Sequence, residues 1–149
     1  MRFATLATAV TLAILPVLGV NFDVSVGANN GLIFAPNTIS GAVAGDTITF
    51  TFVSRIHSAT TTTFVNPCPP PLGGSSSSPD VFDSGFQDAT TGSQPVSVMN
   101  ITTSDTQFIS CRQAAGAHCQ AGMLLVVNPT AELSFSAFAQ NAATDPLQN

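Results

Sequence analysis

Alternating hydrophobic and polar residues predict a set of short β-strands. In residues 46–52, Ile48, Phe50 and Phe52 alternate with threonines, so one face of this strand would be buried and the other would face water. Weaker alternation and short apolar runs predict further strands over residues 23–26, 96–98, 106–110 and 123–127. Several short strands separated by turn residues favour a β-sandwich over alternating helices and strands.

Two segments depart from this pattern. Residues 69–79 are rich in proline, glycine and serine and have little to bury, so we expect a mobile surface loop without chemistry. After Pro129, Thr130 is the expected N-cap of a short terminal helix, with Glu132 in its first turn. The apolar residues at helical spacing are Phe135, Phe138, Ala139 and Ala142. The pattern leaves open whether this helix is docked or loose.

The amino terminus has the pattern of a secretory signal peptide. Arg2 precedes an apolar run that is too short for a transmembrane helix, and Val17 and Gly19 suit a cleavage site before Val20. A buried amino-terminal helix is disfavoured by Pro16. The division we expect is a signal peptide over 1–19, one domain over 20–129, and a helix and tail over 130–149. The last residues lack the hydrophobic tail of a GPI signal, so we expect no lipid anchor.

The charge of the chain excludes one class of partner. The 149 residues have a formal net charge of −5, and Lys and Arg together number 3. Past the signal peptide, the only basic residues are Arg55 and Arg112, which excludes a nucleic-acid footprint. The sequon at Asn100 to Thr102 predicts glycosylation at Asn100 and agrees with secretion. We expect an extracellular monomer, either free or associated with the cell wall.

The chain also contains the donors of a blue-copper centre. These are His57, Cys111, His118 and Met123. Imidazole suits both copper oxidation states, and sulfur favours Cu(I). Taken singly, His57 reads as a surface imidazole, Met123 as core filler and Cys111 as an inert buried thiol. Together they favour copper over zinc, for which a thioether is a poor ligand. The 3 cysteines leave one unpaired whichever disulfide forms.

These residues resemble the fungal extracellular cupredoxins, which are similar to plant phytocyanins, from about Phe22 to Pro129. The resemblance rests on the segments 44–50, His57, 66–68, Cys111 and 118–123. It implies an all-β fold, a cupredoxin-like Greek-key β-sandwich with the metal at one end, to which the sequence adds a short C-terminal helix.

The resemblance also implies roles for individual residues. His57 matches the upstream imidazole, Cys111 the thiolate and His118 the second imidazole, and Met123 matches the axial thioether of one type 1 copper ion. It further implies a disulfide between Cys68 and Cys119. The sequence departs from the phytocyanin pattern in two ways. Residues 107–110 are less aromatic, and the loop from Cys111 to His118 is longer, which could shift His118 relative to the thiolate.

The function that the sequence favours is secreted single-electron transfer by one copper ion. We expect no enzyme, because the sequence shows no paired carboxylates, no Ser-His-Asp arrangement and no His-x-His pair of a multicopper oxidase. The partner would be an unidentified redox partner or a cell-wall component. Two alternatives remain open: a copper-independent structural or interaction module of the cell surface, and copper sequestration without electron transfer.

Overall fold

A computed structural model describes residues 18–147. The signal peptide expected over residues 1–19 therefore lies almost entirely outside the described residues. The elements in chain order are β1 (Asn21–Val26), η1 (Ala28–Asn30), β2 (Phe34–Ala35), β3 (Thr38–Ile39), β4 (Thr47–Phe52), β5 (Ile56–His57), β6 (Thr60–Thr62), β7 (Gln87–Asp88), β8 (Val96–Asn100), β9 (Gln107–Ser110), η2 (Ala114–Gly116), α1 (Ala117–Gln120), β10 (Leu124–Val127) and α2 (Phe135–Thr144).

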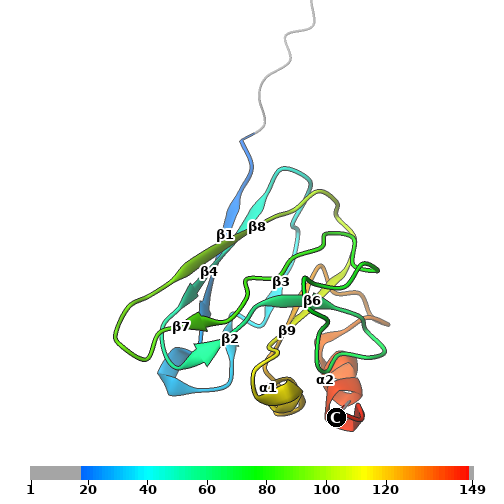
Figure 1. Cartoon of the computed structure of the whole chain (residues 1–149). Coiled ribbons are helices and arrows are strands. Elements are labelled where there is room, and N and C mark those ends of the chain that lie inside the picture. Colours follow the sequence, from blue (N-terminus) through cyan, green and yellow to red (C-terminus); the bar gives the residue numbers. More distant parts are fainter. Residues whose placement is uncertain (1–17, 148–149) are drawn as a thin grey trace, which may run out of the picture.

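Two four-stranded sheets form the body of the protein (Figure 1). Their strand orders are β2-β1-β4-β8 and β3-β10-β9-β6, and the small pair β5-β7 lies apart from them. β1 runs parallel to β4 and β3 runs parallel to β10, whereas the other pairs are antiparallel. Strands that are distant in sequence thus lie side by side, as in Greek-key sandwiches. The predicted all-β sandwich with a short C-terminal helix is confirmed.

The main hydrophobic core is built from inward-facing residues of both sheets. Ile48, Phe50 and Phe52 on β4 are each 0% exposed, which confirms the alternation in the sequence. From the opposite sheet, Ile109 and Leu125 join the same cluster. Each of these aromatic or branched side chains contributes about 1.5–3 kcal/mol by leaving water.

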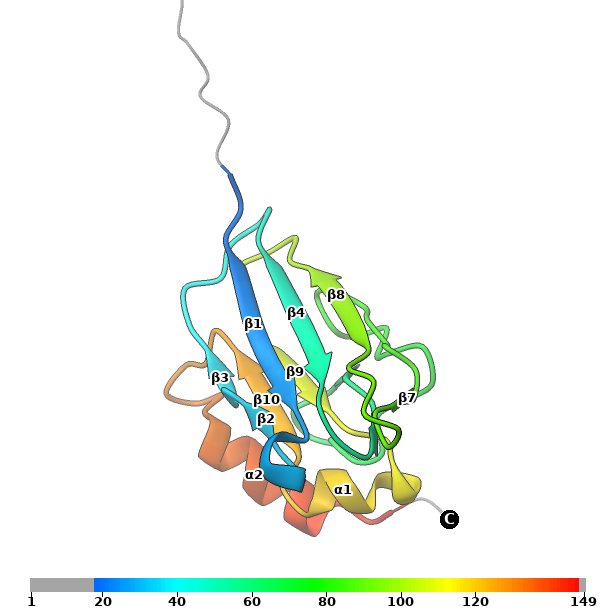
Figure 2. The same ribbon diagram turned by 90° about the vertical axis from the view of Figure 1, so that its left-hand side faces the viewer.

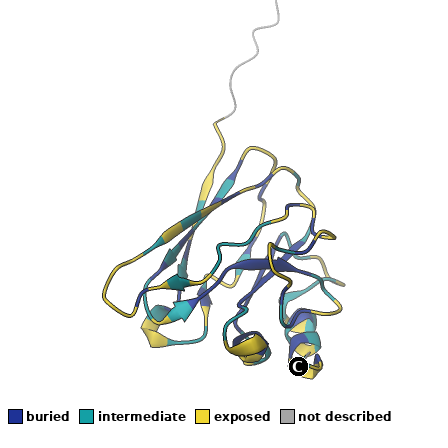
Figure 3. Cartoon of the chain, in the orientation of Figure 1, coloured by how far each residue is buried: buried dark blue, intermediate teal, exposed yellow. Residues whose placement is uncertain are grey.

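A second apolar cluster lies on the outer face of the second sheet. β10 is buried along its whole length because α2 covers that face (Figures 2 and 3). Leu124 and Val126 pack against Phe138 and Ala142 of α2, and the ring centroids of Phe108 and Phe138 are 4.8 Å apart. A strand that is buried on both faces reads as a continuous apolar run, which is why residues 123–127 show no alternation.

The terminal helix begins later than the sequence predicts. Thr130 is not its N-cap: the Thr130 hydroxyl accepts a hydrogen bond from the backbone N–H of Leu133 at 3.0 Å within a preceding turn. The cap is Ser134, whose hydroxyl accepts from the N–H of Ala137 at 3.3 Å. Thr130 and Ser134 are both good N-cap types. The apolar residues at helical spacing begin at Phe135, directly after Ser134, which favours Ser134 as the cap. The helix is docked, and Asn141 donates to the carbonyl of Phe64 at 2.8 Å.

The segment 69–79 forms no strand, as expected, but the expectation that it has little to bury was wrong. Ser75 and Ser78 are only 5% and 8% exposed. The N–H of Ser75 donates to the carbonyl of Thr61 at 2.8 Å. Farther on, the buried Asp80 carboxylate accepts from Gln107 Nε2 at 2.7 Å. Hydrogen bonds rather than apolar side chains anchor this segment, so its hydrophobicity did not reveal it.

Within residues 18–147, no helix combines the length and apolar character that crossing a bilayer requires.

Candidate metal centre

Three donor residues meet at the end of the sandwich that carries α1, which we call the ligand end (Figure 1). His57 ends the short strand β5, Cys111 directly follows β9, and His118 lies in α1. β9 and β10 are antiparallel neighbours, so the segment from Cys111 to Met123 is a closed connection at the end of a rigid hairpin. The N–H of Cys111 donates to the carbonyl of Met123 at 3.2 Å and closes its base.

The extra length of this connection is taken up by a compact turn. η2 contains Ala114, Ala115 and Gly116 in left-handed conformations, with φ of 55°, 50° and 92°. The N–H of Gly116 donates back to the carbonyl of Arg112 at 3.2 Å. This turn folds the chain onto itself, and α1 then returns His118 to the side of Cys111. The longer loop therefore does not separate the imidazole from the sulfur.

The ligating atoms are spaced as a single metal ion requires. Cys111 Sγ lies 3.9 Å from His57 Nδ1 and 3.7 Å from His118 Nδ1. All three atoms lie within 4.8 Å of one another. Metal bonds of about 2.0–2.3 Å to imidazole and thiolate place nitrogen and sulfur about 3.6–3.8 Å apart in tetrahedral or trigonal geometry. The three residues therefore fit a metal ion without rearrangement.

The three converging atoms also offer more hydrogen-bond acceptor sites than there are protons to fill them. If both rings carry their proton on Nε2, the Cys111 thiol can donate to only one of the two Nδ1 atoms. Cys111 is the free cysteine of the described residues, and it is buried. Its sulfur accepts a hydrogen bond from the backbone N–H of Ser58 at 3.4 Å, and the N–H of Gln113 also favours its charged form. Three convergent acceptors with so few donors are the chemistry of a cation site.

Met123 lies next to this group. Its side chain is 0% exposed and belongs to the same apolar cluster as Cys111. Its N–H donates to the carbonyl of His118 at 3.0 Å. The backbone of Met123 is thus hydrogen-bonded to both Cys111 and His118, the two candidate ligands in the loop.

His57 is enclosed more tightly than His118. It is 0% exposed, whereas His118 is 9% exposed. Gly27, in a left-handed conformation, packs against the His57 ring, and a Cβ at this glycine would lie 2.9 Å from both Cδ2 and Nε2. Nε2 of His57 has no hydrogen-bond partner among the described residues. His118 is therefore the imidazole that offers an edge to solvent.

Burial sets the protonation states of the three residues. It lowers the pKa of His57 from 6.5 to about 4, helped by the nearby His118 and Arg55. Burial, and secondly Arg55, also lower the pKa of His118. Burial raises the pKa of the Cys111 thiol, although the N–H groups of Ser58 and Gln113 partly oppose it. At neutral pH both imidazoles are neutral and free to bind a metal, and the thiol proton must leave when the metal binds.

The structure contains the disulfide between Cys68 and Cys119, which joins residues 51 apart in sequence. Cys119 directly follows His118 in α1. The disulfide therefore fixes α1 to the residue just before segment 69–79, which we call the proline-rich loop. Asp145 supports the same place, because its carboxylate accepts from the N–H of Cys68 at 2.8 Å and its carbonyl accepts from Gln120 Nε2 at 2.6 Å. The loop that carries His118 is thus anchored from two sides.

Three residues near the site were not identified from the sequence. Ser58 contributes the N–H to the sulfur, and its hydroxyl accepts from the N–H of Arg112 at 2.9 Å. Gly27 packs against the ring of His57. Arg55 is an exposed cation in a left-handed conformation, with φ of 58°. Ser58 and Arg55 flank His57 closely in sequence, but nothing in the pattern distinguishes them from other loop residues. Gly27 is recognisable only once the fold places it against the ring.

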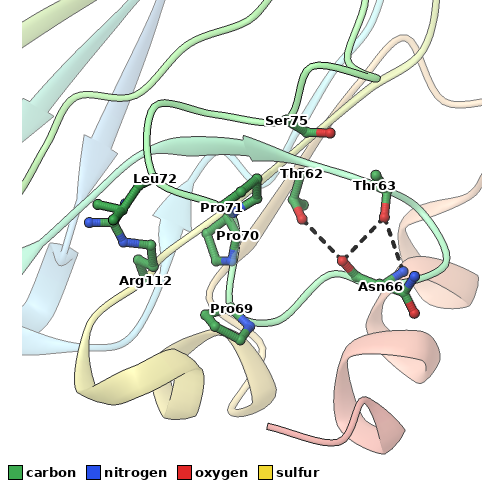
Figure 4. A pocket seen from close by; sticks show the side chains of 9 residues that line it. All are labelled: Thr62, Thr63, Asn66, Pro69, Pro70, Pro71, Leu72, Ser75 and Arg112. Atoms are coloured by element: carbon green, nitrogen blue, oxygen red, sulfur yellow. Dashed lines mark hydrogen bonds between the residues drawn. The ribbon is translucent and has the colours of Figure 1, made fainter. Parts of the chain in front are cut away.

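A separate cavity of about 480 Å³ opens beside the proline-rich loop (Figure 4). Pro69 to Leu72 line one side, and Thr62, Thr63 and Asn66 line another. The two threonine hydroxyls donate to the carbonyl of Asn66 at 3.2 Å. Arg112 reaches the edge of the cavity, and its guanidinium pairs with Asp83 at 3.2 Å. The polar groups of this wall are thus largely satisfied by one another, unlike those of the metal centre.

Comparison with known proteins identifies the fold. No protein-family profile matches the sequence. Auracyanin from Roseiflexus castenholzii superposes with a TM-score of 0.50 at 14% identity, over 74% of this chain and 97% of the auracyanin. Auracyanin A from Chloroflexus aurantiacus, described as a blue copper protein, gives 0.50 at 12% identity, over 74% of this chain and 98% of that protein. Auracyanin B gives 0.50 at 18% identity, over 78% and 93%. The chain has the cupredoxin fold.

One curated relative is similar in sequence. It is an "Extracellular serine-rich protein" of Arthroderma benhamiae, 37% identical over 107 residues. The match includes 71% of this chain but only 38% of that protein. The chain thus spans well under half the length of this relative.

Proposed function

We propose that the protein is a type 1 copper protein of the fungal, phytocyanin-like kind that transfers single electrons outside the cell. The observation that carries the proposal is the convergence of His57 Nδ1, His118 Nδ1 and Cys111 Sγ within 4.8 Å. Under this proposal residues 20–129 are the copper domain, residues 1–19 are a signal peptide, and Met123 is the axial ligand. The partner is an unidentified redox protein or cell-wall component.

Each proposed ligand and each supporting group would have a separate role in electron transfer. Copper would supply a one-electron couple. Cys111 would hold the ion through its thiolate, His57 and His118 would hold it through their imidazoles, and Met123 would add a weak thioether that tunes the potential. The Ser58 N–H stabilises charge on the sulfur. The closed loop and the disulfide hold these groups in place, so little rearrangement accompanies electron transfer. The solvent edge of His118 is the proposed route for the electron.

A spectroscopic titration tests the proposal. Addition of Cu(II) to the metal-free protein is expected to produce an intense blue thiolate-to-copper absorption at one equivalent. Cys111→Ser is expected to abolish it, because serine offers no soft donor. Ser97→Ala, on β8 in the other sheet, is the matched control and should behave as wild type. A colourless copper complex, or full colour in Cys111→Ser, would falsify the assignment.

Met123 and zinc are tested in the same experiment. Met123→Leu keeps the apolar volume and removes the weak donor, so we expect the blue colour to persist with a higher reduction potential. An unchanged potential would remove Met123 from the ligand set. Zinc is expected to compete poorly with Cu(I), and tighter binding of Zn(II) than of either copper state would make this a zinc site.

A second candidate function follows from the serine-rich extracellular relative. The domain could act as a copper-independent structural module of the cell surface, with the sandwich and its glycans as the functional part. Binding to cell-wall polysaccharide that is equal with and without copper would support this function, and its loss in His57→Ala would contradict it. Copper sequestration is separated from electron transfer by measuring both copper affinities together with the reduction potential.

Secretion and glycosylation belong to the same proposal. Asn100 is exposed at the end of β8, and the hydroxyl of Thr102 donates to the Asp80 carboxylate. We expect protein from the culture medium to lose mass on treatment with an N-glycosidase, and Asn100→Gln to remove that change. An unmodified secreted protein would show that the sequon is not used.

A further inference from the structure

A buried carboxylate lies at the end of the sandwich opposite the metal centre, which we call the far end. Asp46 is 3% exposed, and its two oxygens accept from the backbone N–H groups of Val20 at 2.7 Å and Val43 at 2.8 Å. No cation pairs with it among residues 18–147, where the single ion pair joins Arg112 and Asp83 near the ligand end. A buried charge without a counter-charge is costly.

The nitrogen that Asp46 holds most closely belongs to the residue at the predicted cleavage site. Val20 is fixed in place because its carbonyl accepts from the N–H of Thr47 at 2.9 Å. Its side chain is nevertheless 56% exposed, and Leu18 before it is 88% exposed. Residues 18–20 are thus exposed where the chain leads into β1 (Figure 2). The nitrogen that cleavage before Val20 would release already contacts the carboxylate.

Gly19 packs closely against a neighbouring backbone segment. A Cβ at residue 19 would lie 1.8 Å from the carbonyl oxygen of Gly45 and 2.6 Å from its carbon. Only glycine fits between Val20 and this backbone. The hydrogen bond from Val20 to Asp46 does not involve residue 19, so removal of residue 19 leaves this bond in place.

We propose that hydrolysis of the Gly19–Val20 bond creates an α-ammonium group on Val20 that forms a partly buried ion pair with Asp46 and locks the far end of the sandwich. Water adds across the peptide bond: its hydroxyl goes to the Gly19 carbonyl and a proton goes to the Val20 nitrogen, so the products are a carboxylate and an ammonium. This inference depends on cleavage before Val20 and is independent of copper.

The electrostatic surroundings favour the pair. The other ionisable side chains on the segments around Val20 and Asp46 are all acidic. Asp23, Asp105 and Glu132 are exposed, whereas Asp80 is buried and accepts from Thr102, next to Ile101, whose N–H donates to the Asp46 carbonyl. Both arginines of the described residues, Arg55 and Arg112, flank the ligand residues His57 and Cys111 at the other end. An ammonium at Val20 would therefore be the local cation, held by a charge-assisted hydrogen bond.

The absence of lysine makes a direct test possible. Since the chain contains no lysine, the α-amino group is its sole amine. An unperturbed α-amino group has a pKa of about 7.7–8.0, and an ion pair raises it. Acylation of the protein that begins at Val20, followed by intact mass at pH 8, is expected to be at least tenfold slower in the folded than in the urea-unfolded protein.

Two matched forms test the role of Asp46. A chain that begins at Gly19 has the same charges with the amine displaced by one residue, and it should be acylated rapidly. Asp46→Asn keeps the shape and removes the charge, so it should also react rapidly when begun at Val20. The extra stability of the folded Val20 form should be complete below the ordinary α-amino pKa of about 7.7–8.0 and should be lost as the pH rises through the raised pKa of the paired ammonium.

The results separate the outcomes. Equal acylation rates in the three folded forms would overturn the ion pair, even if Asp46→Asn proves unstable, because the Gly19 form retains Asp46. Intact mass of the secreted protein provides the second measurement. A mature chain that begins elsewhere than Val20 would overturn the proposal, while a chain that begins there and reacts slowly would establish it.

Discussion

The two ends of the sandwich both contain buried or half-buried polar groups, and they use them in opposite ways. At the far end, Asn128 donates to the carbonyls of Ala42 and Ser104 and accepts from the N–H of Ala42, at 2.8, 3.0 and 3.0 Å. Its polar atoms are all paired with backbone from other segments. At the ligand end, two imidazole nitrogens and a thiol converge, and the backbone N–H groups of Ser58 and Gln113 act on the sulfur.

The difference separates structural polar groups from functional ones. A side chain that hydrogen-bonds several backbone groups holds the segments that carry them together, and its loss lowers the free energy of unfolding. Buried acceptors that face one another with few donors add little to stability and are suited to holding a cation. Changes at the far end should therefore alter folding, and changes at the ligand end should alter copper binding.

The largest effect is expected from the disulfide, which tests whether the ligand end is held in place from outside. Cys68→Ser with Cys119→Ser releases a loop of 51 residues, and loop-closure entropy gives a loss of about 4 kcal/mol in the free energy of unfolding. Copper affinity should fall as well, because α1 and His118 lose their anchor. Urea denaturation and copper titration measure the two effects, and unchanged affinity would show that the closed loop suffices alone.

The next effect is the pH dependence of the metal-free protein. Burial holds the pKa of His57 at about 4 in the folded protein, below its ordinary 6.5. The unfolded chain therefore binds the proton first, so this contribution is complete above pH 6.5 and is lost as the pH falls toward 4. The loss amounts to up to about 3 kcal/mol. His57→Gln should flatten this part of the curve in urea denaturation, and an identical curve would place the effect on other groups.

At the far end, Asn128→Ala is expected to cost about 2 kcal/mol. It removes three hydrogen bonds to backbone and places alanine at φ of 50°, a left-handed conformation that asparagine tolerates better. Copper affinity and the blue absorption should not change. A change in either would show that the two ends are coupled through the sheets.

The smallest effect comes from a pair of glycines with the same backbone strain. Gly27→Ala and Gly45→Ala each place alanine at positive φ, 82° and 98°, which costs about 1–2 kcal/mol. The new Cβ at Gly45 meets nothing within 4 Å, whereas that at Gly27 lies 2.9 Å from His57 Nε2. Copper affinity should fall about tenfold in Gly27→Ala alone, since the ring must move away from its ligating position. Equal affinities in isothermal titration would mean that the ring adapts.

The sequence predicted the strands whose pattern directly reports burial. β4 alternates because one face meets the core, and β10 is uniformly apolar because both faces are covered. β6 could not be found in this way, since it consists of three buried threonines, Thr60 to Thr62. Their hydroxyls are satisfied by contacts with distant segments, such as Thr60 with Asp83 at 2.8 Å. Burial through tertiary hydrogen bonds leaves no hydrophobic signal.

The candidate site was predictable in its residue types and not in its support. An odd cysteine, two histidines and a methionine indicate copper through their chemistry alone. Ser58 acts through its backbone N–H and Gly27 through the absence of a side chain, so the identities of these residues carry no such information. The N-cap at Ser134 in place of Thr130 is a smaller case, in which two equivalent capping residues compete and packing decides.

The cover that α2 gives to the outer face of β10 has a consequence for how the protein can be shortened. A chain that stopped at Pro129 would contain every proposed copper ligand, yet Phe108 and Leu124 would then face water where Phe138 now lies against them. Asp145 would also be missing from the N–H of Cys68. The smallest fragment that stays folded and monomeric should therefore extend through α2. A fragment that ended at Pro129 would expose the apolar outer face of β9 and β10, and we expect it to self-associate.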